Sequence, residues 1–151
     1  MPGEDGLDPR LVAEAVEQAP DAVVVVDAAG TVRYWNRGAQ RIFGFTPDQM
    51  LGSSLDPIIP ERLRQRHDEG FRAAVSRGSS RYGDHDLLAV PATAADGRTV
   101  SIEFTVVLLS TGDGKIGHVA AFIRDVTERR AREQELRRRL QALEPASSTG
   151  P

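Results

Sequence analysis

Two segments near the start of the chain carry the residue pattern of β-strands. Asp21–Asp27 contains four consecutive valines, which is typical of a strand that is covered on both faces. Thr31–Trp35 is a shorter strand, and Ala28–Gly30 between them predicts a hairpin turn, because glycine readily adopts a positive φ. This part of the chain is therefore expected to form an antiparallel pair of strands.

Short helices are predicted between residues 36 and 52. Asn36 is a suitable N-cap for a helix over Arg37–Phe43, and Gly44 is a residue at which such a helix ends. Thr46 and Pro47 form the cap and the first position of a second short helix. Ala39, Ile42 and Phe43 of the first helix are expected to face inward, and Gly52 ends the second helix.

A longer helix is predicted from about Pro60 to Arg77. His67 lies on its apolar stripe, four residues from both Leu63 and Phe71, so we expect the imidazole to point toward the interior. Ala74 and Val75 extend the stripe. The charged residues of this helix, Arg66 among them, lie mostly on other faces.

Three strands joined by tight turns are predicted in the second half. They are Tyr82–Thr93, Val100–Leu109 and a run that includes Val119–Ile123, with turns at Asp96-Gly97 and at residues 112–114. In the middle strand Val100, Ile102, Phe104, Val106 and Leu108 share one face. The predicted fold is therefore α+β, a five-stranded antiparallel sheet with short helices over one face.

An amphipathic helix is predicted before the first strand. Asp8 and Pro9 are suited to its N-cap and first position. One face of this helix is apolar and consists of Leu11, Val12, Ala15, Val16 and Ala19. Such a face needs a partner surface, which is either the helix's own domain or a second copy of the chain.

The last strand runs almost directly into a polar helix. Asp125 or Thr127 can supply the oxygen that caps the first N–H groups of this helix. Leu136, Leu140 and Leu143 give it one heptad of coiled-coil pattern. A core strand that continues into an exposed helix suits the transmission of a signal, so we expect a signal junction formed by Asp125, Thr127, Glu128 and Arg129.

The boundaries of the chain's parts follow from these elements. Residues 1–7 are expected to be a disordered tail and residues 8–19 the N-terminal flanking helix. Residues 20–126 form the domain itself, residues 127–144 the exit helix, and residues 145–151 a linker or tail. A length of 151 residues suits one such domain with a sizeable core.

Composition and charge exclude several classes of function. The chain has no cysteine, which excludes disulfides, thiolate metal sites, cysteine nucleophiles and photochemistry through a cysteine adduct. A net charge of −3 gives no general affinity for nucleic acid. No apolar run approaches the ~20 residues that span a bilayer, and no signal-peptide pattern is present, so we expect a cytoplasmic protein without membrane contact.

Several short motifs at a characteristic spacing resemble those of PAS domains over roughly residues 14–128. The resemblance rests on Asp21–Asp27 followed by Gly30, on Trp35-Asn36-Arg37-Gly38-Ala39 and on Phe43-Gly44-Phe45-Thr46. Gly52, the Asp96-Gly97 turn and Asp125-Val126-Thr127-Glu128-Arg129 complete it. The order of strands and helices is similar as well.

The resemblance implies a sensory and dimerising module of a bacterial-type signal-transduction protein, such as a two-component system or a transcription regulator. A small ligand in an apolar cavity would be coupled through the exit helix to an output domain. Homodimerisation is expected. We expect the cavity to be lined by Leu63, His67, Phe71, Ile102, Phe104, Val119 and Ala121.

The Arg62–Asp68 segment resembles the one in which FixL-type oxygen-sensing PAS domains bind haem iron. His67 matches the position of the proximal ligand, so the resemblance implies that any cofactor is haem b with His67 as its metal ligand. The chain departs from the FixL pattern at the distal arginine, which falls near Leu87 or Leu88. A structural histidine is the alternative, and the identity of the ligand stays open.

No constellation of catalytic residues is evident. The chain has no Ser-His-Asp set, no phosphate-binding glycine loop and no HExxH motif, so we expect a regulatory domain and not an enzyme. Asp84-His85-Asp86 alternates between the two faces of a strand, which favours a solvated edge over a metal site. A dimerisation module with a filled core is the remaining alternative to a ligand sensor.

Overall fold

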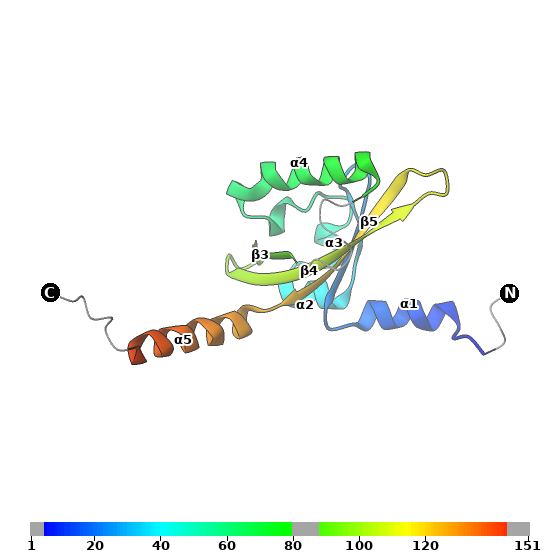
Figure 1. Cartoon of the computed structure of the whole chain (residues 1–151). Helices are drawn as coiled ribbons and strands as arrows, with labels where there is room; N and C mark the ends of the chain where they lie inside the picture. Colours follow the sequence, from blue (N-terminus) through cyan, green and yellow to red (C-terminus); the bar gives the residue numbers. More distant parts are fainter. Residues whose placement is uncertain (1–4, 80–87, 145–151) are drawn as a thin grey trace.

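The computed structural model describes residues 5–79 and 88–144 (Figure 1). The elements are, in chain order, helix α1 (Pro9–Gln18), strands β1 (Ala22–Asp27) and β2 (Val32–Trp35), helices α2 (Arg37–Phe43) and α3 (Pro47–Met50), the short 3-10 helix η1 (Asp56–Ile58), helix α4 (Glu61–Arg77), strands β3 (Leu88–Thr93), β4 (Thr99–Ser110) and β5 (Ile116–Asp125), and helix α5 (Thr127–Leu143). The first residues of the predicted strand Tyr82–Thr93, and with them Asp84-His85-Asp86, lie outside the described residues.

The five strands form one antiparallel sheet in the order β2-β1-β5-β4-β3. The predicted α+β fold is therefore confirmed. β5 is the central strand, and its Ala121 lies opposite Val24 of β1 on one side and Val106 of β4 on the other. The strand that leads into α5 is thus hydrogen-bonded along both edges.

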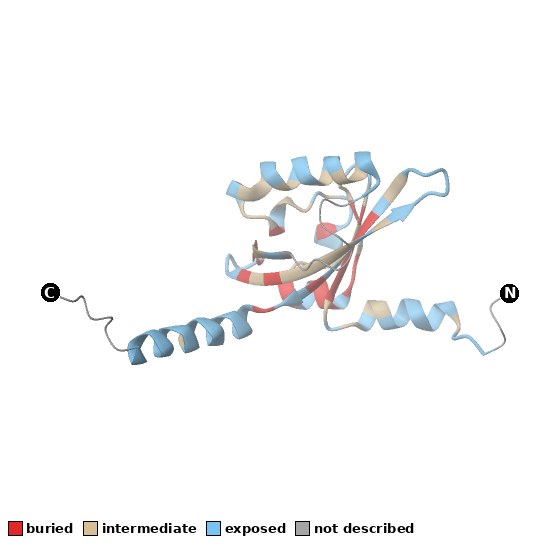
Figure 2. Cartoon of the chain, in the orientation of Figure 1, coloured by how far each residue is buried: buried red, intermediate tan, exposed pale blue. Residues whose placement is uncertain are grey.

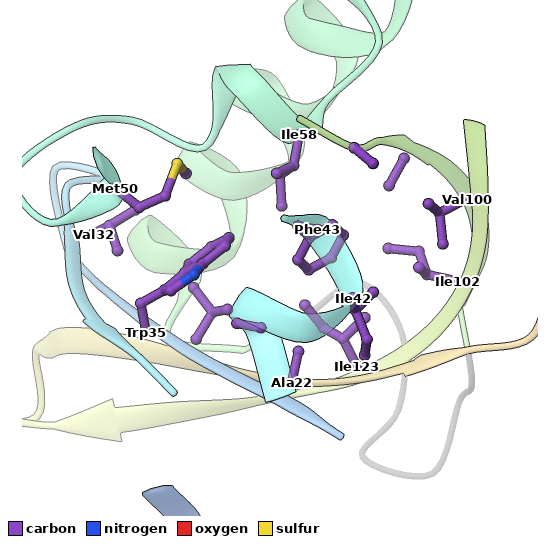
Figure 3. Close-up of a cluster of buried hydrophobic side chains, with 14 of the residues drawn as sticks. Ala22, Val32, Trp35, Ile42, Phe43, Met50, Ile58, Val100, Ile102 and Ile123 are labelled. Carbon is purple, nitrogen blue, oxygen red and sulfur yellow. The ribbon is translucent and has the colours of Figure 1, made fainter. Parts of the chain in front are cut away.

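The hydrophobic core lies between one face of this sheet and the short helices (Figure 3). Phe43 of α2 and Met50 of α3 are fully buried, and the rings of Trp35 and Phe43 pack with centroids 5.6 Å apart. The strand residues of the core share the inner face, and they are Ala22, Val24, Val26, Val32, Trp35, Ala92, Val100, Ile102, Val119 and Ile123. The alternation of residues along the strands thus decides which face the helices cover.

Local hydrogen bonds explain where the short elements begin and turn. The Asn36 side chain accepts from the Ala39 N–H and so caps α2, which ends at Gly44 with a φ of 80°. Thr46 and Gln49 form a reciprocal capping box at α3. In the β1–β2 hairpin the Thr31 N–H donates to the Asp27 carboxylate, and this bond lowers the pKa of Asp27.

α4 differs from α2 because it has no buried residue, although it lies across the sheet. Figure 2 shows its outer face exposed and its inner face at intermediate burial. Leu63, His67 and Phe71 of the predicted stripe are all half-buried. The helix therefore rests on few close contacts, and the reason is the cavity described below.

α1 and α5 project away from the sheet and its covering helices (Figure 1). Leu11 and Val12 of α1 are about half exposed, whereas Val16 and Ala19 are partly buried. On α5 the predicted seam is exposed and consists of Leu136, Leu140 and Leu143. No helix within residues 5–79 and 88–144 combines the length and apolarity that crossing a membrane requires.

Side-chain hydrogen bonds attach the C-terminal part of α1 to the domain. The Asn36 amide donates to Val16 O at 2.8 Å, and the Tyr34 hydroxyl donates to Glu17 Oε2 at 2.5 Å. Arg41 donates to Pro20 O at 2.6 Å, just beyond the helix. The C-terminal end of α1 is therefore held to the domain by hydrogen bonds, while Leu11 and Val12 nearer its N-terminus are exposed to solvent.

Burial and the hydrogen bond to Glu17 raise the pKa of Tyr34 to about 12. Because the folded state favours the neutral phenol, this contact stabilises the fold fully below the ordinary tyrosine pKa of about 10 and loses that effect as pH rises toward 12. We expect an ultraviolet titration, with Tyr34→Phe identifying the signal, to show Tyr34 ionising well above pH 10. Glu17→Gln should lower that midpoint, whereas the exposed Glu14→Gln should not, and equal effects would contradict the assignment.

Candidate functional site: an apolar cavity beneath α4

A cavity of about 280 Å³ lies between α4 and the inner face of the sheet. Three of its walls come from α4, β4 and β5. Seven lining residues are those expected from the sequence, and they are Leu63, His67, Phe71, Ile102, Phe104, Val119 and Ala121. The structure thus brings all seven to one space, although their role in binding remains a proposal.

Further lining residues come from segments that the helix stripe does not reveal. β1 contributes Val24 and Val26, the η1 region Leu55, Ile58 and Ile59, and β3 Val90, Pro91 and Ala92, while Val106 and Ile123 extend the walls on β4 and β5. Alternation of faces puts Val24 and Val26 on one side of β1, but four consecutive valines do not reveal which side is the inner one. The curvature of the sheet, which residue patterns do not encode, brings β3 opposite β1.

Arg66 also lines the cavity, in contrast to the expectation that the arginines of this helix lie mostly on other faces. It lies three residues after Leu63 and five before Phe71, so it borders the same side of the helix. The i, i+3 spacing was the signal that could have identified it. Arg64, by comparison, donates to the Ile59 carbonyl at 3.1 Å.

His67 and Arg66 are the two polar side chains among the described residues that line the cavity. The His67 ring stacks on Phe71 with centroids 6.3 Å apart. Its Nδ1 is buried and has no hydrogen-bond partner among the described groups, because the Asp68 carboxylate is 3.6 Å away, beyond hydrogen-bond length. The His67 side chain as a whole is 37% exposed.

A second, more polar hollow of about 410 Å³ lies beside the first. Four residues line both spaces and so lie between the apolar cavity and the polar hollow: Val26, Leu55, His67 and Phe71. Asp56, Asp68 and Arg72 contribute the charges of the second hollow, and Gly30 of the β1–β2 hairpin closes one side. His67 therefore stands at the edge between an apolar and a polar environment.

The side chains that line the cavity suit a haem, but the volume of the cavity is small for one. An imidazole with an unpaired nitrogen, apolar walls and Arg66 at the rim are the groups that haem b and its propionates require. However, 280 Å³ lies below the roughly 300–1,000 Å³ of pockets that hold drug-sized ligands, and a porphyrin is large among these. Residues 5–79 and 88–144 hold no cluster of three His, Asp or Glu side chains suited to a metal ion.

The junction between β5 and α5 is held to β4 by backbone and side-chain contacts. Val126, the residue between the two elements, is buried and donates its N–H to Ser101 O at 2.8 Å. The Ser101 N–H in turn donates to Thr127 Oγ1 at 3.0 Å. Arg129 forms an ion pair with Glu103, whose side chain is largely buried.

Of the two residues expected to cap α5, Asp125 supplies the oxygen, although it is not the N-cap residue itself. Val126 occupies the N-cap position, and its side chain supplies no hydrogen bond. Asp125 Oδ1 accepts from the Thr127 N–H at 2.9 Å and from the Thr127 hydroxyl at 2.6 Å. Thr127 Oγ1 accepts a hydrogen bond from Ser101 of β4 and not from the helix. Glu128 forms an ion pair with Arg132 on the exposed surface.

Comparisons with known proteins agree with this geometry. A family model described as "PAS fold" matches residues 16–131. An uncharacterized protein from Azorhizobium caulinodans is 34% identical over 79% of this chain and 17% of its own length. The sensor protein FixL of Bradyrhizobium diazoefficiens is 28% identical over 87% of this chain and 26% of its own length.

Among solved structures, the PAS domain of a protein from Colwellia psychrerythraea superposes with a TM-score of 0.69 at 20% identity, over 80% of this chain and 98% of that one. The likeness in fold therefore extends over nearly all of that domain. The chain spans about a sixth to a quarter of the length of the two relatives above, which are much longer proteins. The chain belongs to the PAS family of sensory domains.

Proposed function

We propose that this domain binds a small, mainly apolar ligand beneath α4 and transmits its presence through α5 to an output domain of a signal-transduction protein. One observation carries the proposal. Val119, Ala121 and Ile123 line the cavity and belong to β5, which is separated from α5 by the single residue Val126. A ligand that displaces β5 therefore acts on the start of the exit helix.

The proposal requires that α5 can take two alternative positions. The Ser101 hydrogen bonds and the Arg129–Glu103 ion pair attach the first turn of the helix to β4 and would be the contacts that change between them. A ligand needs only a differential affinity of a few kcal/mol for the two positions in order to shift their populations. A larger change in the sheet is not required.

Association between two copies of the chain is part of the proposal. Val107, Leu109 and Phe122 form an exposed apolar group on the outer face of β4 and β5. Leu11 and Val12 of α1 and the leucines of α5 are exposed as well. Exposed apolar surface of this kind is typical of interaction sites, and a homodimer through α1 and the outer sheet face would cover Leu11, Val12 and the group on β4 and β5.

Ligand binding is tested by native mass spectrometry of the purified chain for a co-purified molecule, followed by thermal-shift measurements with a panel of small apolar compounds. We expect at least one compound to bind at one molecule per chain. Ala121→Phe should abolish binding because the ring fills the cavity, whereas Ala73→Phe on the exposed face of α4 should not. Unaltered binding in the Ala121 variant would contradict the proposal.

Transmission is tested by amide hydrogen exchange at Ser101 and Val126. We expect a bound ligand to change the exchange of both amides, because both are held within the junction. Thr127→Val removes the oxygen that accepts from Ser101 and should reduce the difference between the free and bound states. A ligand that binds without any change at these amides would show that the junction does not respond.

Haem is a second candidate ligand, favoured by the unpaired Nδ1 of His67 on the cavity wall. In that case His67 would hold the iron, and the haem would supply gas or redox sensing. α4, which has no buried residue, would have to move outward to make room. Titration with hemin should then give a Soret band that His67→Ala removes, and the absence of stoichiometric binding would exclude this candidate.

A further inference from the structure

The two polar side chains that line the cavity come from one turn of α4, with the exposed Arg66 at the rim of an otherwise hydrocarbon space. Arg66 and His67 are consecutive residues of α4, and the other described side chains that line the cavity are apolar. A ligand without any polar group would leave both side chains without a function. The lining therefore favours a ligand that has a polar group at one end, beside Arg66 and His67, and is apolar elsewhere.

His67 is the group that such a ligand would satisfy. Its Nδ1 is buried without a hydrogen-bond partner, and a buried polar atom in this state is a source of instability. Stacking on Phe71 holds the ring at the boundary of the cavity. A ligand oxygen at this position would convert an unpaired nitrogen into a hydrogen-bonded one.

Arg66 determines the sign of the charge that fits beside His67. Its guanidinium is cationic at every pH of interest and presents several N–H donors in a planar array that matches a carboxylate. Asp68 and Asp56 face the adjacent hollow and would oppose a group with two negative charges, such as a phosphate monoester. A single carboxylate has the charge and the number of acceptors that one guanidinium and one imidazole can satisfy.

We propose, on the basis of the ligand-binding function above, that the ligand is a small amphipathic carboxylic acid. Its carboxylate is held by Arg66 and His67, and its hydrocarbon part occupies the space between Phe71, Ile102 and Ala121. The 280 Å³ of the cavity limits the length of that hydrocarbon part. Within a homologous series, each additional buried CH₂ should tighten binding about fourfold until the cavity is full.

The test compares octanoic acid with octan-1-ol, which has the same chain length and no charge, by isothermal titration calorimetry on the whole chain. We expect the acid to bind the wild type at least about tenfold more tightly than the alcohol, because hydrogen bonds to charged groups contribute that much. Arg66→Gln should reduce this ratio to near one. Arg62→Gln changes the same residue type one turn earlier, at a position that does not line the cavity, and should leave the ratio unchanged.

The outcomes separate this inference from the function on which it rests. Equal binding of acid and alcohol overturns the carboxylic acid, and a preference for the acid that persists in Arg66→Gln overturns its contact with Arg66. Either result leaves the ligand-binding function in place. If neither compound binds, a scan from butanoic to decanoic acid and the corresponding alcohols follows. Failure of both whole series to bind overturns the inference, and it also counts against a ligand site of this size beneath α4.

Discussion

Replacing Gly38 by alanine is expected to destabilise the domain by about 1–3 kcal/mol, although alanine is the better helix former. Gly38 is the second residue of α2, and it lies against the segment that joins α1 to β1. A Cβ atom there would be 2.0 Å from Asp21 O and 2.7 Å from Ala19 O. Both neighbours are backbone atoms, so no flexible side chain can move aside, and α2 would have to shift away from β1.

Urea denaturation followed by circular dichroism measures the effect, and Gly70→Ala is the matched control. Gly70 is also within a helix, but nothing lies within 4 Å of the position of its Cβ. That variant should therefore be more stable than the wild type by about 0.5–1 kcal/mol, the ordinary difference in helix propensity. Two glycine variants that change stability in the same direction would contradict the steric explanation.

Much of the fold was predictable because its elements have local causes. Asn36, Thr46 and Pro47 cap or begin helices through contacts within a few residues, and Gly44 and Gly97 adopt positive φ where the helix or hairpin ends. The antiparallel order follows from short connections between β1 and β2 and among the last three strands. None of these features depends on distant parts of the chain.

Residues of the site were predictable from the sequence only where the apolar pattern along one helix or strand identifies them. The stripe of α4 indicated Leu63, His67 and Phe71, but not how deeply they are buried. They are only half-buried because the space beneath them is a cavity and not other side chains. Arg66 was assigned to another face, since the width of the cavity along the helix depends on the curvature of a sheet that forms from strands far apart in sequence.

The packing of α4 is consistent with a sensor and unlike that of a rigid core element. α2 has four buried residues within seven positions, whereas α4 has none in seventeen. Segments with few buried apolar contacts open at low free energy, and ligand-binding elements are drawn from them. Under the proposed function, α4 would open to admit the ligand while α2 keeps its packing on the sheet, and the ligand would act on α5 through β5.

Asn36 combines the roles of helix cap and anchor for α1, and its replacement should have the largest effect on stability. The side chain is fully buried. Its Oδ1 accepts from Val23 N at 2.8 Å and Ala39 N at 2.9 Å, while Nδ2 donates to Val16 O at 2.8 Å and Asp21 O at 3.1 Å. Four backbone groups in β1, α2, α1 and the α1–β1 connection thus meet at one amide.

Asn36→Ala leaves these four backbone groups without their partner, and we expect a loss of about 3–5 kcal/mol in the free energy of unfolding. Asn36→Ser retains an acceptor for the Ala39 N–H and should lose less, while Thr46→Ala removes the exposed cap of α3 and should lose only about 1 kcal/mol. Urea unfolding gives this ranking, and limited proteolysis between residues 16 and 21 reports the release of α1. If Asn36→Ala were no more destabilising than Thr46→Ala, the amide would be only a helix cap, and the attachment of α1 would have to come from Tyr34 and Arg41 alone.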